Sequence, residues 1–348
     1  MTRHPFDSWF NECGAYVLVD GSFGSTGKGL LANYMTNFAA GKVNVVTTNA
    51  APNSGHSAWI GDDLVITRQV PVMSVALKRM GQDTLTYINA GAMIDPKILS
   101  NEMLWLDYNR VAIHPCAAII TEDDANEEKS TIEKNIASTG KGGGAALAHK
   151  IRRDQYSIAR NLYLTFLPSD RESWDNFWNW NRDVVFVEVS QGHSLGVNSA
   201  SFYPYTTSRE CGVAQALSDA RIPPQMLKKV VMTCRTYPIR VGNTEGHSGF
   251  CYPDQRELQW ADIGVEPELT TVTKRVRRVF TWSRIQFREA VANNHPDVIF
   301  LNFAQYLGTH GLEHVIRDIR EDYEKVTGKE LRNLLLGFGP RSEDVRVA

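Results

Sequence analysis

Residues 15–35 read AYVLVDGSFGSTGKGLLANYM, and this stretch decides the fold class. An apolar run rich in valine is followed by a glycine-rich segment, residues 21–29, and then by a run with helical spacing. A glycine-rich turn between a strand and a helix suits phosphate, because its backbone N–H groups and the positive helix end face the anion. The stretch therefore predicts a phosphate-loop-like turn in which Lys28 supplies a positive charge.

This loop differs from the common GxxxxGK[ST] motif. Position 22 is serine rather than glycine, and Gly29 stands where a magnesium-binding Ser or Thr would follow the lysine. These differences disfavour an ordinary phosphate-loop kinase. A glycine-rich turn with a surface lysine is the structural alternative.

The rest of the chain alternates short apolar runs with longer segments of helical period. The apolar runs are residues 43–46, 64–67, 184–189, 229–233 and 298–303. The helical segments are residues 30–38, 96–107, 145–164, 282–292 and 312–326. This alternation predicts an α/β fold with a mostly parallel central sheet and helices on both faces. Because no repeat or linker composition divides the sequence, we expect one elaborated domain over residues 1–348.

Composition excludes several classes of protein. The 348 residues include 37 Lys and Arg and 39 Asp and Glu, so the net charge of -2 gives no general reason to bind nucleic acid or an anionic membrane. Five cysteines without a CxxC pair indicate neither a disulfide framework nor a zinc ribbon. The sequence shows neither a signal-peptide core nor an apolar stretch long enough to span a bilayer, so we expect a cytoplasmic protein.

Further polar clusters fall where ligands bind in α/β proteins. Asn53-Ser54-Gly55-His56-Ser57 follows an expected strand, and His56 is either an acid or electrophile or a hydrogen-bonded structural residue. The segment at 138–144, STGKGGG, precedes an expected helix and is either a phosphate site or a flexible linker. Gln191-Gly192, the sequence YPYTTS at 203–208 and the arginine-rich run at 270–278 complete the set, since arginine is a preferred partner of carboxylate and phosphate.

Taken in chain order, these segments and Gly339-Pro340 resemble the adenylosuccinate synthetase family over most of the chain. The resemblance implies the fold of that family and its reaction, in which aspartate condenses with carbon 6 of a purine monophosphate while a triphosphate is cleaved. It also implies a ligase that requires Mg²⁺.

Two departures from the family pattern are informative. Ser25 stands where the family motif GDEGKG has the aspartate that takes the ring proton from IMP, and Asn302-Phe303-Ala304 replaces the Lys-x-Asp that recognises guanine. Both changes resemble the phage branch of the family, the 2-aminoadenylosuccinate synthetases, which act on dGMP in making 2-aminoadenine for DNA. Serine leaves space for the 2-amino group of guanine. The resemblance therefore implies L-aspartate and dGMP as substrates, with ATP or dATP rather than GTP as the phosphoryl donor, in the cytoplasm of a phage host.

The resemblance also implies roles for individual residues. The expected catalytic residues are Ser25, Lys28, His56 and Gln191. The expected triphosphate site consists of Gly24, Ser25, Thr26, Gly27, Lys28, Gly29, Gly55, His56, Ser57, Asn302, Ala304, Gly339 and Pro340. The expected dGMP site consists of Ser25, Asn53, Ser138, Thr139, Arg153, Gln191 and Thr207. Aspartate would be bound by Thr273, Arg275 and Arg277, and the metal by Ser25 and Gly55. Arg153 matches a residue that reaches into the neighbouring subunit's site, which implies a homodimer.

Two alternatives stay open at this stage. One is a conventional adenylosuccinate synthetase that acts on IMP, against which the missing aspartate argues. The other is a non-catalytic nucleotide-binding paralogue, against which the retained Lys28, His56 and Gln191 argue.

Overall fold

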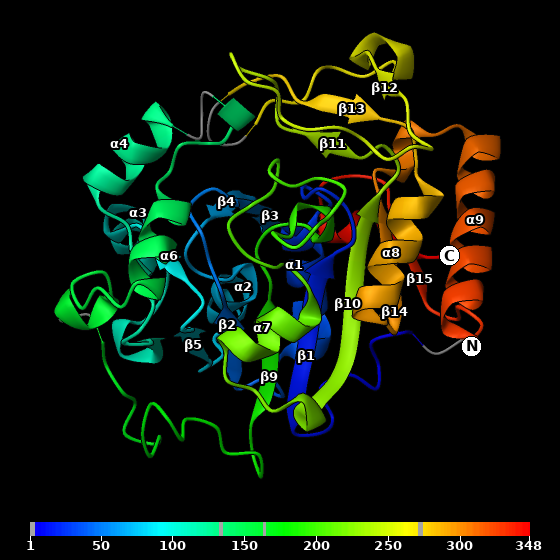
Figure 1. Ribbon diagram of the computed structural model, residues 1–348. Helices are drawn as coiled ribbons and strands as arrows, with labels where there is room; N and C mark the ends of the chain where they lie inside the picture. Colours follow the sequence, from blue (N-terminus) through cyan, green and yellow to red (C-terminus); the bar gives the residue numbers. More distant parts are fainter. Residues whose placement is uncertain (1–3, 132–134, 163–164, 271–273) are drawn as a thin grey trace.

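The centre of the protein is a large sheet, seen in a computed structural model that describes residues 4–131, 135–162, 165–270 and 274–348. Within these residues the sheet has nine strands in the order β16-β15-β14-β10-β1-β9-β2-β5-β7 (Figure 1). Their bounds, in chain order, are β1 (Gly14–Asp20), β2 (Val45–Thr48), β5 (Leu85–Ile88), β7 (Val111–Ile113), β9 (Val184–Glu188), β10 (Leu227–Arg235), β14 (Val298–Asn302), β15 (Leu334–Gly337) and β16 (Val345–Val347). Neighbouring strands are parallel except β15 and β16, so the predicted mostly parallel sheet is confirmed.

Helices cover both faces of this sheet. The helices α1 (Lys28–Ala39) and α2 (Val72–Arg79) pack on one face. The helices α7 (Val213–Asp219), α8 (Arg284–Asn294) and α9 (Thr309–Thr327) pack on the other. This arrangement explains why β1 is apolar up to Val19, since successive side chains of a strand point to opposite faces.

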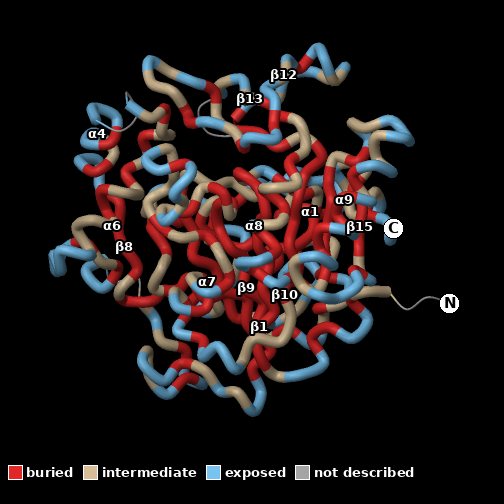
Figure 2. The backbone as a smooth tube through the Cα atoms, turned by 45° about the vertical axis from the view of Figure 1, so that its right-hand side comes forward, coloured by how far each residue is buried: buried red, intermediate tan, exposed pale blue. Residues whose placement is uncertain are grey.

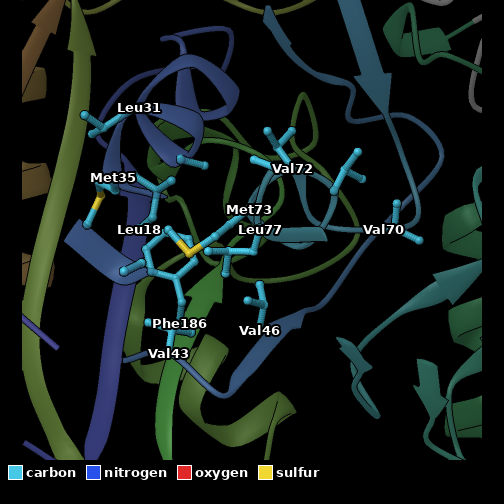
Figure 3. Close-up of a cluster of buried hydrophobic side chains, with 14 of the residues drawn as sticks. Leu18, Leu31, Met35, Val43, Val46, Val70, Val72, Met73, Leu77 and Phe186 are labelled. Atoms are coloured by element: carbon cyan, nitrogen blue, oxygen red, sulfur yellow. The ribbon is translucent and has the colours of Figure 1, made fainter. Parts of the chain in front are cut away.

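Each face has its own hydrophobic core. On the α1 side, Leu18 and Phe186 of the sheet lie with Leu31 of α1 and Met73 of α2 (Figure 3). On the other side, Val17 belongs to a second cluster with residues of α7, α8 and α9. Figure 2 shows the buried residues along the central strands and the exposed residues in the outer loops.

Smaller elements lie around the central sheet. Three further sheets pair β3 (His56–Ile60) with β4 (Asp63–Thr67), β6 (Met93–Ile94) with β8 (Ala118–Ile119), and β13 (Arg278–Phe280) with both β11 (Ile239–Arg240) and β12 (Glu257–Leu258). The remaining α-helices among the described residues are α3 (Pro96–Glu102), α4 (Glu122–Ser130) and α6 (Gly143–Ile151). The sheet of β11, β12 and β13 lies at the top of the molecule in Figure 1, beyond the carboxyl end of β10. In the part of the chain that the structure describes, no helix is both long enough and apolar enough to cross a bilayer.

Three expected elements differ from the structure. The helix expected over 96–107 ends at Glu102 and is followed by a 3-10 turn over Met103–Trp105. Residues 64–67 belong to the antiparallel hairpin of β3 and β4 rather than to the central sheet. The helix expected over 145–164 ends at Ile151, because Arg153 adopts a left-handed backbone conformation with φ of 65° that a helix cannot continue through.

Candidate active site

The glycine-rich loop between β1 and α1 folds around the carboxylate of Asp20. One oxygen of this buried side chain accepts hydrogen bonds from the backbone N–H groups of Ser22 (2.8 Å) and Gly24 (3.3 Å). The other accepts from the Thr26 hydroxyl (2.5 Å) and from Lys28 Nζ (3.0 Å). The Thr26 hydroxyl is therefore engaged inside the protein. The sequence analysis did not select Asp20, although it is the last residue of the strand that leads into the loop.

Close packing explains two of the loop glycines. A Cβ atom on Gly27, whose φ is 91°, would lie 2.1 Å from Asn302 Nδ2. A Cβ atom on Gly29 would lie 2.5 Å from the carbonyl oxygen of Ser57. The loop is thus pressed between the end of β14 and the start of β3, and α1 begins at Lys28 with its N-terminus beside the loop. A helix N-terminus favours negatively charged groups such as phosphate.

A cavity of about 1030 Å³ opens beside the loop, at the edge where the parallel strands have their carboxyl ends. It brings together most of the expected site residues. Those that line it are Gly24, Ser25, Thr26, Gly27, Lys28, Gly29, Asn53, Gly55, His56, Ser57, Ser138, Thr139, Gln191, Thr207, Arg277, Asn302, Gly339 and Pro340.

Three of the expected site residues that the structure describes are not in this lining. Ala304 is fully buried, with 0% of its surface exposed. Arg153 is exposed and Arg275 is half-buried, and neither lines the cavity. Thr273 lies outside the described residues.

The imidazole of His56 is held by a buried carboxylate. Its Nδ1 lies 2.6 Å from Oε1 of Glu188, a residue at the carboxyl end of β9 that is completely buried. Because a carboxylate only accepts, Nδ1–H donates to Glu188 and Nε2 is left as the reactive atom. Nε2 has no hydrogen-bond partner among the described residues, while His56 lines the cavity. This is the geometry of an imidazole oriented to act on a ligand.

Glu188 was missed by the sequence analysis. Its carboxylate also accepts hydrogen bonds from the backbone N–H groups of Val72 (3.3 Å) and Met73 (3.4 Å) at the start of α2. The signal was a single acid inside the apolar run VVFVEV. Buried charges in such runs are rare unless they are paired.

Two residues expected to bind dGMP are joined directly. The side-chain amide of Gln191 donates to Oδ1 of Asn53 (2.7 Å). The backbone carbonyl of Gln191 accepts from Lys28 Nζ (2.9 Å), so the same residue contacts the phosphate loop. Gln191 adopts a left-handed conformation with φ of 71°, which turns the chain back towards the loop after β9.

At the end of β14, the side chain of Asn302 is already engaged. Its amide donates to the carbonyl of Thr26 (3.2 Å) and its oxygen accepts from the backbone N–H of Phe303 (2.8 Å). Gln305 lies three residues after Asn302, lines the cavity and is exposed. Its carboxamide makes no hydrogen bond with any residue that the structure describes. Sequence analysis did not select Gln305.

The carboxylates that line the cavity already have partners within the protein. Among the described lining residues the acids are Glu128 and Glu268, and both are engaged. Glu128 accepts from the backbone N–H groups of Gly142 (2.7 Å) and Gly144 (2.6 Å), and Glu268 pairs with Arg235 (2.6 Å). Neither acid is free to bind a substrate in this arrangement.

Burial weakens the proton affinity of two arginines that line the cavity. It lowers the pKa of the Arg240 guanidinium to about 9 and that of Arg277 to about 10. An anionic ligand group beside either guanidinium would offset this desolvation and favour the charged form. The cavity is therefore suited to anionic ligands such as phosphates and carboxylates.

The residues present fit magnesium only together with a nucleotide. Within the described ranges no three His, Cys, Asp or Glu side chains come together as a metal site. Mg²⁺ requires oxygen ligands and is commonly bound through substrate phosphates with several waters retained. The backbone carbonyl of Gly55 and the hydroxyl of Ser25, both in the cavity lining, are donors of the right chemistry.

Comparison with known proteins identifies the family. The profile described as adenylosuccinate synthetase matches residues 169–333. The N6-succino-2-amino-2'-deoxyadenylate synthase of Vibrio phage phiVC8 is 36% identical over 343 residues, which cover 95% of this chain and 97% of the phage protein. The chain belongs to the adenylosuccinate synthetase family. The predicted family and its phage branch are confirmed.

Within the family, similarity to the phage enzymes exceeds similarity to a conventional member. The adenylosuccinate synthetase of Methanosphaera stadtmanae is 26% identical, with 94% of this chain and 96% of the archaeal protein covered. The solved structure of the cyanophage S-2L succinoaminodeoxyadenylate synthetase, bound to dGMP and dATP as an energy donor, has a TM-score of 0.81 and 32% identity. The alignment covers 97% of this chain and 96% of that protein. The family fold predicted from the sequence is therefore confirmed.

Proposed function

We propose that this protein is a ligase that joins L-aspartate to carbon 6 of dGMP, driven by cleavage of ATP or dATP. The product is 2-amino-2'-deoxy-N6-succinyladenylate, a precursor of 2-aminoadenine in DNA. One observation carries the choice of dGMP: Ser25 lines the cavity at the position of the family's aspartate. Its short side chain leaves room for the 2-amino group of guanine, and the phage relatives named above support the same substrate.

The chemistry has two steps in the family's reaction. The 6-oxygen of dGMP attacks the terminal phosphorus of the triphosphate, the ring N1 proton is lost, and ADP or dADP leaves. The amine of aspartate then attacks carbon 6 and loses its proton, and inorganic phosphate leaves. Lys28 and Nε2 of His56 stabilise negative charge on the transferring phosphoryl group, and Glu188 keeps His56 oriented throughout.

The donor base follows from the groups at the end of β14. Guanine presents two adjacent N–H donors that a carboxylate accepts well, but Ala304 is buried and apolar, and both described acids of the cavity are engaged. Leaving such donors unpaired costs about 1–3 kcal/mol each. Adenine presents one donor and one acceptor, which a carboxamide such as that of Gln305 can satisfy together. ATP and dATP are therefore the favoured donors.

Three further features belong to this proposal. Gly55 and Ser25 would hold Mg²⁺ together with the triphosphate, and the ion would supply positive charge that offsets the charge of the phosphates. Arg275 and Arg277 bind aspartate, and the match to the family motif assigns Thr273 the same role. The protein forms a homodimer in the cytoplasm of a phage host, and Arg153, whose side chain is exposed, reaches into the dGMP site of the partner.

A competition assay tests the substrate assignment. The protein is incubated with aspartate, Mg²⁺ and ATP, and with dGMP, GMP, IMP or dIMP in parallel reactions. We expect dGMP to be converted fastest. Faster conversion of IMP would instead identify a conventional adenylosuccinate synthetase, and no conversion of any acceptor would indicate a non-catalytic paralogue.

A further inference from the structure

Arg235 is a buried arginine at the carboxyl end of β10, and it contacts the phosphate loop. Its surface is 0% exposed, and its Nη1 donates to the backbone carbonyl of Ser25 (3.0 Å). Ser25 has a φ of 56°, a conformation that non-glycine residues rarely adopt without support from their surroundings. The hydrogen bond from Arg235 supplies such support.

The same guanidinium forms a two-pronged ion pair with Glu268. Nη2 lies 2.6 Å from Oε1 and Nη1 lies 3.2 Å from Oε2. Glu268 is bound in turn to the segment that contains the arginines expected to bind aspartate, because its carbonyl accepts from the backbone N–H of Arg277 (2.9 Å). The hydroxyl of Thr270 accepts from the backbone N–H of Arg275 (2.9 Å), a second hydrogen bond within this segment.

A third contact places Arg235 against the segment after β14. Its guanidinium carbon lies 3.9 Å from the ring centroid of Phe303, within the range of a cation–π interaction. The next residue, Thr236, donates its hydroxyl to the carbonyl of Phe303 (2.8 Å). Phe303 itself lines the cavity, beside Asn302 and Gln305.

We propose that Arg235 is a positioning residue that fixes the phosphate loop and the aspartate-binding segment in one arrangement, through the Ser25 carbonyl and Glu268. The role rests on the proposed function, since it assumes that dGMP and aspartate react beside these segments. Arg235 itself does not line the cavity, so it acts through its neighbours rather than on the substrates.

Only a planar guanidinium meets all three partners at once. Its fork matches the carboxylate of Glu268, its face stacks on Phe303 and its Nη1 reaches Ser25. Lysine offers a single charged atom without a stacking face, so Arg235→Lys keeps the charge and loses the geometry. Glu268→Gln keeps the shape and loses the charge.

The chain offers a matched control in Arg171. This buried arginine also pairs with a carboxylate, that of Asp183 (2.5 Å), donates to a backbone carbonyl and lies over an aromatic ring, that of Phe177. It does not line the cavity. Arg171→Lys therefore reports the cost of disturbing a buried arginine without disturbing the site.

The kinetic experiment measures turnover of dGMP at varied aspartate for the wild type and for Arg235→Lys, Glu268→Gln and Arg171→Lys. We expect the KM for aspartate to rise at least tenfold, and kcat to fall, in the first two variants but not in the third. The double variant Arg235→Lys with Glu268→Gln should have kinetic constants little worse than those of the more impaired single variant, because both changes break the ion pair between these two residues. An unchanged KM in both Arg235→Lys and Glu268→Gln would overturn the proposal.

Hydrogen exchange provides a readout that needs no activity. Amides of residues 21–29 and 274–278 should exchange faster in Arg235→Lys than in the wild type, and Arg171→Lys should leave both segments unchanged. Faster exchange in only one segment would refute the coupling even if the wild type turned over no substrate. If Arg235→Lys does not fold, Glu268→Gln decides by the same measurements. Failure of wild-type turnover alone would refute the proposed function and leave this test standing.

Discussion

Replacing Glu188 with glutamine tests how much this buried carboxylate contributes to the chemistry of His56. The variant keeps the size of the side chain but turns a charge-assisted hydrogen bond of 2.6 Å into a neutral one. It also places an amide N–H₂ group beside one of the N–H donors of α2, so a bond to Val72 or Met73 is lost as well. A hydrogen bond to a charged group contributes about 1.5–3 kcal/mol. At about 1.36 kcal/mol per tenfold change, kcat should fall roughly 10- to 150-fold.

The loss should appear in kcat rather than in substrate affinity. The interaction of His56 with the phosphoryl group strengthens as charge develops in the transition state, so ground-state binding depends on it less. Single-turnover kinetics with dGMP, aspartate and ATP measures the chemical step, and calorimetry measures dGMP binding. His56→Ala should show the same pattern with a larger loss.

Glu102→Gln is the matched control for this prediction. Glu102 is also buried and accepts hydrogen bonds from three backbone N–H groups, those of Arg68, Gln69 and Val70, but it does not line the cavity. The Glu102→Gln substitution should lower the melting temperature without lowering kcat. The reasoning is refuted if Glu188→Gln keeps the wild-type rate of the chemical step, or loses only as much as Glu102→Gln.

Four further outcomes are expected. Ser25→Asp should suppress turnover of dGMP in the competition assay, because the longer carboxylate crowds the 2-amino group of guanine; undiminished dGMP turnover would contradict the steric argument. Mixing inactive Arg153→Ala and Lys28→Ala chains should restore part of the activity, since one site of each mixed dimer is intact; no recovery after proven subunit exchange would count against the shared site. Gln305→Glu should raise the ratio of the initial rate with GTP to that with ATP at least tenfold, because a carboxylate accepts both N–H groups of guanine and cannot donate to adenine. Gln225→Glu, the same change on an exposed turn away from the cavity, should leave this ratio unchanged. Burial lowers the pKa of His114 from 6.5 to about 4, so the unfolded chain binds a proton that the folded chain does not, and stability should fall as the pH drops through this range. Chemical denaturation at several pH values should show that the free energy of unfolding depends less on pH in His114→Asn than in the wild type.

Features encoded in contiguous residues could be predicted from the sequence. The loop of residues 21–29 is recognisable because its glycines, its lysine and the flanking strand and helix are adjacent in the chain. The same holds for residues 53–56, which follow β2 in the chain, and for Gln191, which follows β9. Each lies at the carboxyl end of a strand, and the parallel sheet brings these ends together.

Partners that are distant in the chain could not be predicted. Glu188 and His56 are 132 positions apart in the sequence, and Arg235 and Ser25 are 210 positions apart, so no local sequence pattern indicates either contact. The sequence predicts residues 64–67 in the central sheet, because a short apolar run has the same appearance there as in the hairpin of β3 and β4. The early end of α6 was missed for a different reason, since apolar spacing does not reveal a residue with positive φ.

The position of β1 has a consequence for the synthesis of the chain. Although β1 precedes the other described strands in the chain, it lies between β9 and β10, and its partner residues extend to Thr233. One of its hydrogen-bonding edges therefore stays without its native partner until β9 has left the ribosome, and the other until β10 has followed. During that interval an apolar strand is available for wrong pairing. The phosphate loop depends on β1, Arg235 and Asn302, so it can take its final shape only late in synthesis. A chain truncated before Arg235 should therefore fail to bind nucleotide and should aggregate.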